Sequence, residues 1–478
     1  ASAAAWALGR VLDVNPIAIP DAVQASLFEV VVSRLSREPR LAEEFCYCLD
    51  GIVDQQAAVL EPELFGPVVE SLLQGAVRSE AGGRARVALL RSLAELVGRA
   101  ADDCVPRMEP ALVELLRAAE AELDSGRAPA STVVGCLRAL ILRLPAERVV
   151  SHAEALLGLF VRSLTAQHAA NGSFDEDCLR AVGTLATALG ARFQAGMPSF
   201  GPLLLAALRS PEEPEACLAA LSALSNVAGA LGSQLFPSAP AALEALASLL
   251  RRHGTASDQL PLEPRLRPRA VHCLGDILLA LGANTPNLEA VLALLADEAE
   301  AAGAVAGVMP AKAGLEGYEN TAGVPLARQP VFLLCKPRLG RGSTAGPGTP
   351  PASVAADATR RREILDAVLG AYEALFRACR NSGTTSVPPA LLGACLPSAL
   401  QLGLRLATPE DVPQNTLRLV LKFLGPLAAE MPAELRAHLS SHPDAAACVS
   451  KLASFGSVSP NKATRELSAA LGQLLSST

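Results

Sequence analysis

Aromatic side chains are scarce in this sequence of 478 residues: they make up 3% of it, with a single tryptophan, although 50% of the residues are hydrophobic. The apolar content therefore comes mainly from alanine and leucine, which favour helices and bury well between closely packed helices. This composition predicts an all-α protein.

We expect neither a membrane-spanning helix nor a signal peptide. Charges or prolines interrupt the apolar stretches before the roughly 18 residues that a bilayer requires can accumulate. Residues 1–6 show no charged region followed by a cleavage site. Since the chain starts without methionine and inside a helical pattern, we expect it to be a fragment whose preceding repeats are missing.

Motifs of common enzymes and metal sites are also missing. The sequence contains no GxxxxGK(S/T) phosphate loop, no HExxH pair and no GxSxG elbow. Cys46 and Cys48 lack the CxxC spacing and the second ligand pair of a zinc site. We therefore expect no catalytic residue, no cofactor and no metal.

The 11 cysteines are numerous enough for disulfides, but several occupy apolar helix positions. We expect reduced, buried thiols that act as small hydrophobic side chains, as in a cytosolic or nuclear protein. These positions are Cys136, Cys178, Cys217, Cys273 and Cys379.

Charge is unevenly distributed along the chain. Residues 1–300 carry 24 basic and 36 acidic side chains, whereas residues 301–478 carry 17 and 12. An acidic first part would attract basic partners and repel nucleic acid, although such charges can also merely solvate outer helix faces. The arginines at 265–269 and 360–362 lack interleaved aromatics, so we expect no nucleic-acid binding.

An internal repeat organises the sequence. Residues 178–190, 217–232 and 270–282 are three apolar helices that each end in Leu-Gly. Glycine is the residue expected just after a helix, in the left-handed conformation. Apart from one wider gap, related helices start about 37 to 53 residues apart, close to the period of HEAT and armadillo repeats, and partner helices lie between them.

Each repeat is therefore a helical hairpin, which must stack on its neighbours because it cannot bury its apolar face alone. We predict an all-α HEAT-repeat α-solenoid, a right-handed superhelix of antiparallel helix pairs. Small residues in the second helices, such as Ala181, Gly183, Ala219 and Ala220, would let adjacent helices approach closely.

Three segments follow from the repeat pattern. Residues 1–300 are expected to form about seven helix pairs, the first one truncated, and residues 359–478 about three. Between them, residues 301–358 are rich in Gly, Pro, Ala and Ser and bury too little apolar surface to offset the cost of ordering. We expect a disordered insertion there, between the two helices of one repeat.

Residues 175–177, Asp-Glu-Asp, have two interpretations. They are either a paired-carboxylate site or the start of a helix, where acidic groups cap free N–H groups and complement the helix dipole. We favour capping.

Residues 4–11 are Ala-Ala-Trp-Ala-Leu-Gly-Arg-Val, and residues 36–47 contain Glu-Pro-Arg before a predicted helix with Cys-Tyr. In the same order, they resemble the Ala-Ala-Trp-x-x-Gly-Arg helix of the importin β (karyopherin β) family and its next unit, a Glu-Pro-Arg turn before a helix carrying Cys-Trp. Residues 274–282 and 461–463 resemble later helices. Because the order is kept, the chain is similar to the C-terminal half of importin β.

This resemblance implies a nuclear import receptor of the cytoplasm, nucleus and nuclear pore. Its partners would be nucleoporins and a basic importin-α-type adaptor segment or cargo held on the concave face. Regulation by Ran GTPase is implied too, with the main Ran site in N-terminal repeats that this chain lacks, and with neither catalysis nor membrane insertion. The alternative is a static HEAT scaffold subunit that organises a phosphatase-like complex.

Inner-helix tryptophans of the family stack against Arg and Lys of the cargo segment, and acidic residues pair with it. Trp6 matches one such tryptophan, whereas Tyr47 replaces a second and Ala469 a third. Trp6 has the alternative role of packing between repeats. The partner-binding residues implied in this sequence are Trp6, Tyr47, Glu43, Glu44, Asp50 and Asp54.

Trp6→Ala is expected to weaken affinity for a basic importin-β-binding peptide by about 1–2 kcal/mol, because a desolvated cation–π contact is lost, with little change in the fold. Fluorescence anisotropy with the labelled peptide measures the affinity, and circular dichroism measures helicity. Loss of helicity or of thermal stability would instead support packing between repeats.

Overall fold

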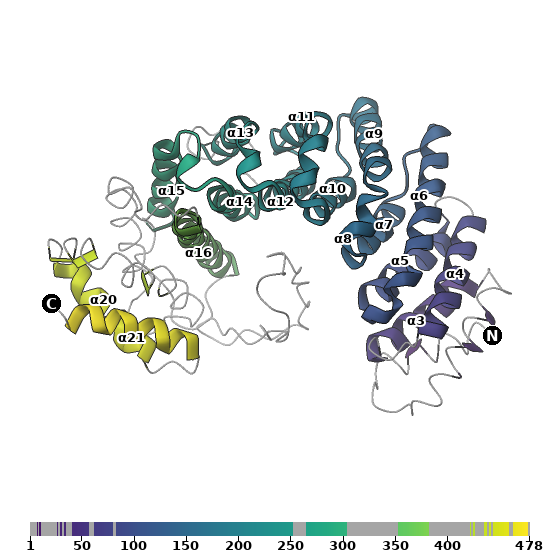
Figure 1. The fold of residues 1–478 in the computed structure, drawn as a ribbon, viewed down its shortest axis with the longest axis horizontal. Helices are drawn as coiled ribbons and strands as arrows, with labels where there is room; N and C mark the ends of the chain where they lie inside the picture. The colour runs from purple at the N-terminus through teal and green to yellow at the C-terminus, as the bar shows by residue number, and fades with distance from the viewer. Residues whose placement is uncertain are drawn as a thin grey trace. The chain divides into compact units, whose positions relative to one another are not determined.

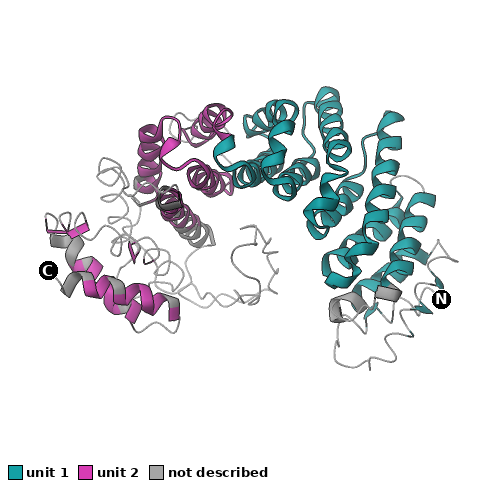
Figure 2. Ribbon diagram, in the orientation of Figure 1, with its two compact units in different colours: residues 1–234 teal, residues 235–478 magenta. Residues whose placement is uncertain are grey.

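The computed structural model describes residues 41–56, 62–79, 83–251, 264–303, 352–381, 443–457 and 462–476, together with a few single positions elsewhere. Regular structure in these ranges consists of α-helices and short 3₁₀ helices, without a strand, which confirms the all-α prediction (Figure 1). The chain divides into two compact units, residues 1–234 and 235–478 (Figure 2).

Unit 1 contains two layers of helices. Within each layer, successive helices contact one another, and each helix of the first layer also packs against the second-layer helix that follows it in sequence. The unit is therefore a row of stacked helical hairpins, as the repeats predicted. The first-layer helices are α4 (Pro62–Arg78), α6 (Glu109–Asp124), α9 (Ala153–Asn171) and α11 (Met197–Leu208). The second-layer helices are α3 (Ala42–Gln56), α5 (Arg84–Arg99), α7 (Ser131–Arg143), α10 (Glu176–Leu189) and α12 (Pro214–Leu231).

Unit 2 repeats this arrangement. Its helices α13 and α15 contact each other, as do α14 and α16, and the pairs α13 with α14 and α15 with α16 form hairpins. A further pair, α20 with α21, lies near the end of the chain. The bounds are α13 (Ala239–Arg251), α14 (Leu266–Leu281), α15 (Leu288–Gly303), α16 (Ala352–Asn381), α20 (Pro443–Ser457) and α21 (Lys462–Ser476).

The expected insertion is shorter than its predicted bounds. Helix α15 continues to Gly303 and α16 begins at Ala352, so both ends of the 301–358 segment are helical. The helix-forming alanines at each end and the proline at position 351, just before α16, favour these extensions. Residues 304–351 lie outside the described residues, and their disorder stays a prediction.

Cysteines belong to the packed interior, as expected. Cys136, Cys178, Cys217 and Cys273 are buried and free of disulfides, and burial raises the pKa of the Cys136 thiol to about 12. A protonated thiol is a poor nucleophile and a poor metal ligand. The side chain of Cys379 lies outside the described part of the chain.

The Leu-Gly helix ends share one backbone conformation, but not the one we expected. Gly190, Gly232 and Gly282 have φ of 57°, 52° and 56° with ψ of −137°, −128° and −133°. The positive φ confirms the need for glycine, whereas this ψ is far from that of the left-handed helix. The reason is that each glycine opens a 3₁₀ turn, which redirects the chain toward the next hairpin.

Small residues bring neighbouring second-layer helices close together. A Cβ added to Gly183 in α10 would lie 2.8 Å from the Cα of Ala223 in α12. One added to Gly275 in α14 would lie 3.0 Å from the Cα of Ala371 in α16. The expected close approach of these helices is confirmed.

Asp175 caps helix α10. Its Oδ1 accepts hydrogen bonds from the backbone N–H of Asp177 at 2.8 Å and of Cys178 at 2.9 Å. This confirms capping rather than a paired-carboxylate site.

One apolar helix is longer than we expected. Residues 216–236 contain neither a charge nor a proline. The expectation that a charge or a proline interrupts every apolar stretch before roughly 18 residues was therefore wrong. Pro214–Leu235 is apolar enough to cross a membrane, yet 61% of its apolar window is buried inside the protein. Contacts of α12 with α10 and α11 account for this burial, as in a core helix.

Gly183→Ala is expected to lower the free energy of unfolding by about 1–3 kcal/mol, because the added methyl group collides with the backbone of Ala223. Gly135→Ala is the matched control, since nothing lies within 4 Å of a Cβ added there. The control is expected to keep stability unchanged or to raise it by up to about 1 kcal/mol through alanine's helix propensity. Urea unfolding compares the two, and equal stabilities would contradict the close contact.

Candidate functional site

Helix α3 carries most of the residues expected to bind a partner. Phe45, Cys46 and Leu49 are buried against the rest of unit 1. The opposite face carries Glu43, Tyr47, Asp50 and Asp54, whose spacing of four, three and four residues places them in one line along the helix. Glu43 is exposed, and Glu44, beside this line, is half-buried. The position of Asp54 on this face follows only from its position in the helix sequence. Trp6 lies outside the described residues.

Tyr47 has a packing role on this face. A methyl group added at Gly9 would overlap the ring of Tyr47, so the half-buried ring lies directly on the glycine backbone. Gly9 is helical and belongs to the stretch that contains Trp6. This contact accounts for part of the burial of the Tyr47 ring.

Asp50 is held by the neighbouring helix. Ser92 of α5 is 1% exposed, and its Oγ donates a hydrogen bond of 2.6 Å to Oδ1 of Asp50. This contact ties α3 to α5 across residues 42 positions apart in sequence. The carboxylates on the face of α3 therefore differ: Asp50 is part of the packing between repeats, whereas Glu43 extends into solvent.

Arginines lie on the exposed or half-buried sides of the next second-layer helices, α5, α7 and α10. The exposed side of α5 carries Arg84 and Arg91, and α7 carries half-buried Arg138. On α10, Arg180 pairs with Glu176 at 2.7 Å and with Asp177 at 3.2 Å. Our sequence analysis missed these arginines, although the seven-residue spacing of Arg84 and Arg91 opposite an apolar stripe was a signal that could have found them.

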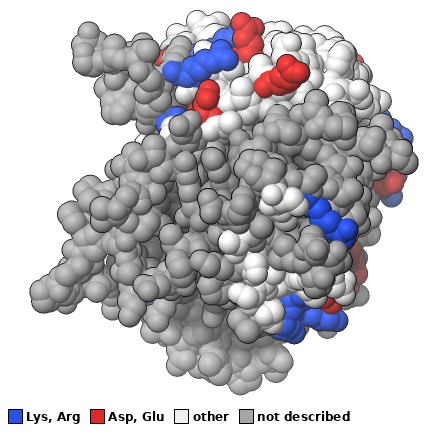
Figure 3. Space-filling model, turned by 90° about the vertical axis from the view of Figure 1, so that its left-hand side faces the viewer, with Lys and Arg blue, Asp and Glu red and all other residues white. Residues whose placement is uncertain are grey.

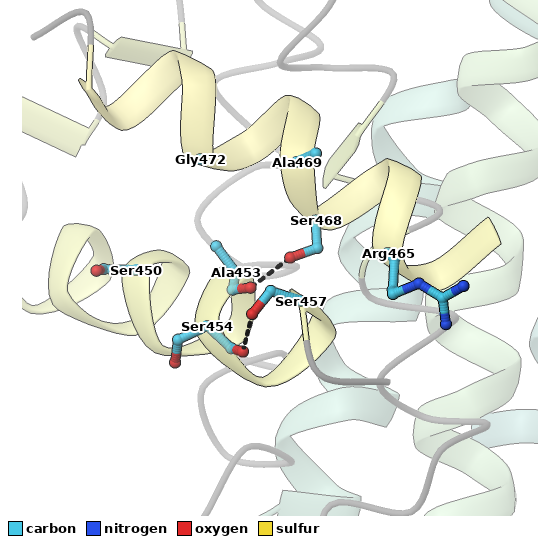
Figure 4. Close-up of a pocket in the computed structure, with 8 residues that line it drawn as sticks. All are labelled: Ser450, Ala453, Ser454, Ser457, Arg465, Ser468, Ala469 and Gly472. Atoms are coloured by element: carbon cyan, nitrogen blue, oxygen red, sulfur yellow. Dashed lines mark hydrogen bonds between the residues drawn. The ribbon is translucent and has the colours of Figure 1, made fainter. Parts of the chain in front are cut away.

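Ala469, where the family resemblance implies a tryptophan, lines a pocket between α20 and α21 (Figure 4). The Ser468 hydroxyl donates a hydrogen bond to the carbonyl oxygen of Ala453 across this pair. Most of the described lining side chains are small and none of them is aromatic, so these residues offer no aromatic face to a cation. The lining residues are Ser450, Ala453, Ser454, Ser457, Arg465, Ser468, Ala469 and Gly472.

Arginine pairing reduces the basic character of unit 2. Arg267 donates two hydrogen bonds to Glu298, at 2.6 and 3.0 Å, and Glu298 is 3% exposed. On the face shown in Figure 3, acidic and basic side chains of the described residues lie beside one another. Such mixing produces only weak long-range fields.

Stacked helical hairpins define the class of protein: this is a helical-repeat protein of the α-solenoid type. A family model described as Importin subunit beta-1-like, TPR repeats, matches residues 26–306. That match covers more than half of the chain, and the chain therefore belongs to the importin subunit beta-1-like family.

Known relatives agree with this assignment. Importin subunit beta-1 of Arabidopsis thaliana is 26% identical over 303 residues, which are 58% of this chain and 34% of that protein. A crystal structure of importin beta superposes on this chain with a TM-score of 0.73 at 19% identity, and the match covers 99% of this chain and 50% of the importin beta chain. The Kap95:Nup1 complex gives a TM-score of 0.64 at 18% identity, and the match covers 99% of this chain and 50% of the matched chain. The chain thus spans about half the length of the two solved chains. Its match to the curated Arabidopsis protein covers about a third of that protein.

Asp50→Ala is expected to lower the free energy of unfolding by about 1–3 kcal/mol, because the buried Ser92 hydroxyl loses its acceptor. Glu43→Ala, on the same helix face but exposed, is expected to change it by less than about 0.5 kcal/mol. Thermal or urea unfolding of the two variants measures the difference. A stable Asp50→Ala variant would show that the Ser92 contact contributes nothing to packing.

Proposed function

We propose that this chain is part of a nuclear import receptor whose α3 face binds a basic importin-α-type adaptor segment or cargo. The observation that carries the proposal is the line of Glu43, Tyr47 and Asp50 on the solvent side of a second-layer helix, within the part matched by the family. In this proposal Trp6 and Tyr47 supply aromatic faces for cations, and Glu43, Glu44, Asp50 and Asp54 supply carboxylates.

The chemistry of this face suits a segment rich in arginine and lysine. Carboxylates attract such a segment over about 10 Å at moderate salt and then form charge-assisted hydrogen bonds with it. An aromatic ring adds attraction through its electron-rich face. Since Asp50 and Tyr47 are already held by packing, they would lose little freedom on binding, which favours affinity.

Other partners follow from family membership. The solved Kap95:Nup1 complex supports nucleoporin binding by this chain, and passage through the nuclear pore between cytoplasm and nucleus. Regulation by Ran GTPase would involve mainly repeats that precede this chain in its relatives. The proposed receptor has no catalytic step and needs no cofactor.

A static scaffold for a multiprotein complex is the second candidate. The contacts of Tyr47 with Gly9 and of Asp50 with Ser92 favour it, because both side chains would then serve packing alone. The two candidates differ in the charge of the ligand that α3 recognises.

Glu43→Gln is expected to weaken binding of a basic importin-β-binding peptide about two- to fivefold at low salt, because one exposed carboxylate is lost. Glu154→Gln, an exposed position on first-layer helix α9, is the matched control and should leave the affinity unchanged. Fluorescence anisotropy over a salt series measures both, and the affinity should fall as salt rises. Absence of binding by the unmodified chain at low salt would rule out import-receptor binding by this part and favour the scaffold.

A further inference from the structure

Helices α5 and α7 each carry an arginine on the solvent side of the second layer. Arg91 on α5 is exposed and Arg138 on α7 is half-buried, and neither forms a hydrogen bond or ion pair with any residue that the structure describes. These helices contact each other in the second layer of unit 1, and α7 also contacts α10 (Figure 1). Their exposed sides therefore form a continuous strip, which begins next to the acidic face of α3.

Arg138 lies in an electrostatically unfavourable position. Partial burial and the nearby Arg180 guanidinium lower the pKa of Arg138, and Asp177 opposes this only in part. Asp177 and Glu176 are themselves bonded to Arg180. A half-buried guanidinium without a hydrogen-bonded carboxylate gains more from an incoming anion than a fully hydrated one does, since water screens the attraction less.

One helical turn from each of these cations, an apolar side chain is exposed. Leu142, one helical turn after Arg138, is 54% exposed, and Val87, one turn before Arg91, is 39% exposed. Apart from the backbone of α7 itself, no atom of the described residues lies within 4 Å of a Cβ added to Gly135, which leaves this part of α7 open to close approach. On each helix a cationic and an apolar position thus lie about one helical turn apart. Glu95, one turn after Arg91, is already paired with Arg99 at 3.6 Å.

We propose that the strip formed by Val87, Arg91, Arg138 and Leu142 binds an acidic, leucine-containing peptide segment of a partner protein. Carboxylates of the segment pair with the two guanidinium groups, and its apolar side chains cover Val87 and Leu142. The apolar positions favour a peptide over nucleic acid, because a phosphate backbone has nothing to place on an exposed leucine. This site differs in charge from the α3 face and does not depend on the function proposed for that face.

The probe is a short fluorescein-labelled peptide of glutamate and leucine, with a matched peptide carrying glutamine in place of glutamate. The unmodified full chain is expected to bind the acidic peptide and not the neutral one, with affinity falling as salt rises. Arg138→Gln should weaken binding about fivefold or more, and Leu142→Ser should weaken it to a similar extent. Arg117→Gln is the matched control, because Arg117 lies on first-layer helix α6 with a side chain that is 69% exposed.

Several results would overturn the proposal: no binding of the acidic peptide at low salt, equal binding of the neutral peptide, or equal weakening by Arg117→Gln. Displacement of the peptide by single-stranded DNA, lost with Arg138→Gln, would show that the strip binds nucleic acid instead. Thermal unfolding must be unchanged in Arg138→Gln, and Arg138→Lys, which keeps the charge, should restore part of the affinity. Binding of the basic peptide should not weaken in Arg138→Gln, so failure of this proposal is distinguishable from failure of the import-receptor proposal.

Discussion

Close contact between neighbouring second-layer helices is the constraint on which the rest of this structure depends. A single hairpin has no core of its own, so its stability comes from the neighbours that cover it. Gly183 against Ala223 and Gly275 against Ala371 show how near these helices lie, with backbone atoms where side chains would otherwise be. A composition rich in alanine and leucine and poor in aromatics suits helices that pack this closely.

This constraint also decides which residues can meet a partner. Helices α5, α7 and α10 each contact a hairpin partner and two neighbouring second-layer helices, and a second-layer helix packed in this way keeps one exposed stripe. On α3 that stripe is acidic, and on α5 and α7 it carries Arg91 and Arg138. Two adjacent surfaces of opposite charge therefore follow from one packing arrangement.

Local signals in the sequence were sufficient to predict much of the fold. The Leu-Gly ends, the repeat spacing and the acidic start of α10 each depend on a few consecutive residues, and the hairpins, the glycines of positive φ and the Asp175 cap confirm them. The exact ψ of those glycines and the helical ends of the 301–358 segment were missed. Both depend on how a hairpin joins or meets its neighbour, which no short window of sequence specifies.

The sequence by itself determined the helical class, the repeat and the family, because helix periodicity and the order of motifs are properties of the chain alone. Only the tertiary structure decided the roles of the candidate site residues. Asp50 proved to be held by Ser92 and Tyr47 to cover Gly9. Arg138 proved to lie near Arg180, without a hydrogen-bonded carboxylate among the residues that the structure describes. The physical reason is that these contacts join residues about 40 positions apart, which come together only when one repeat stacks on the next.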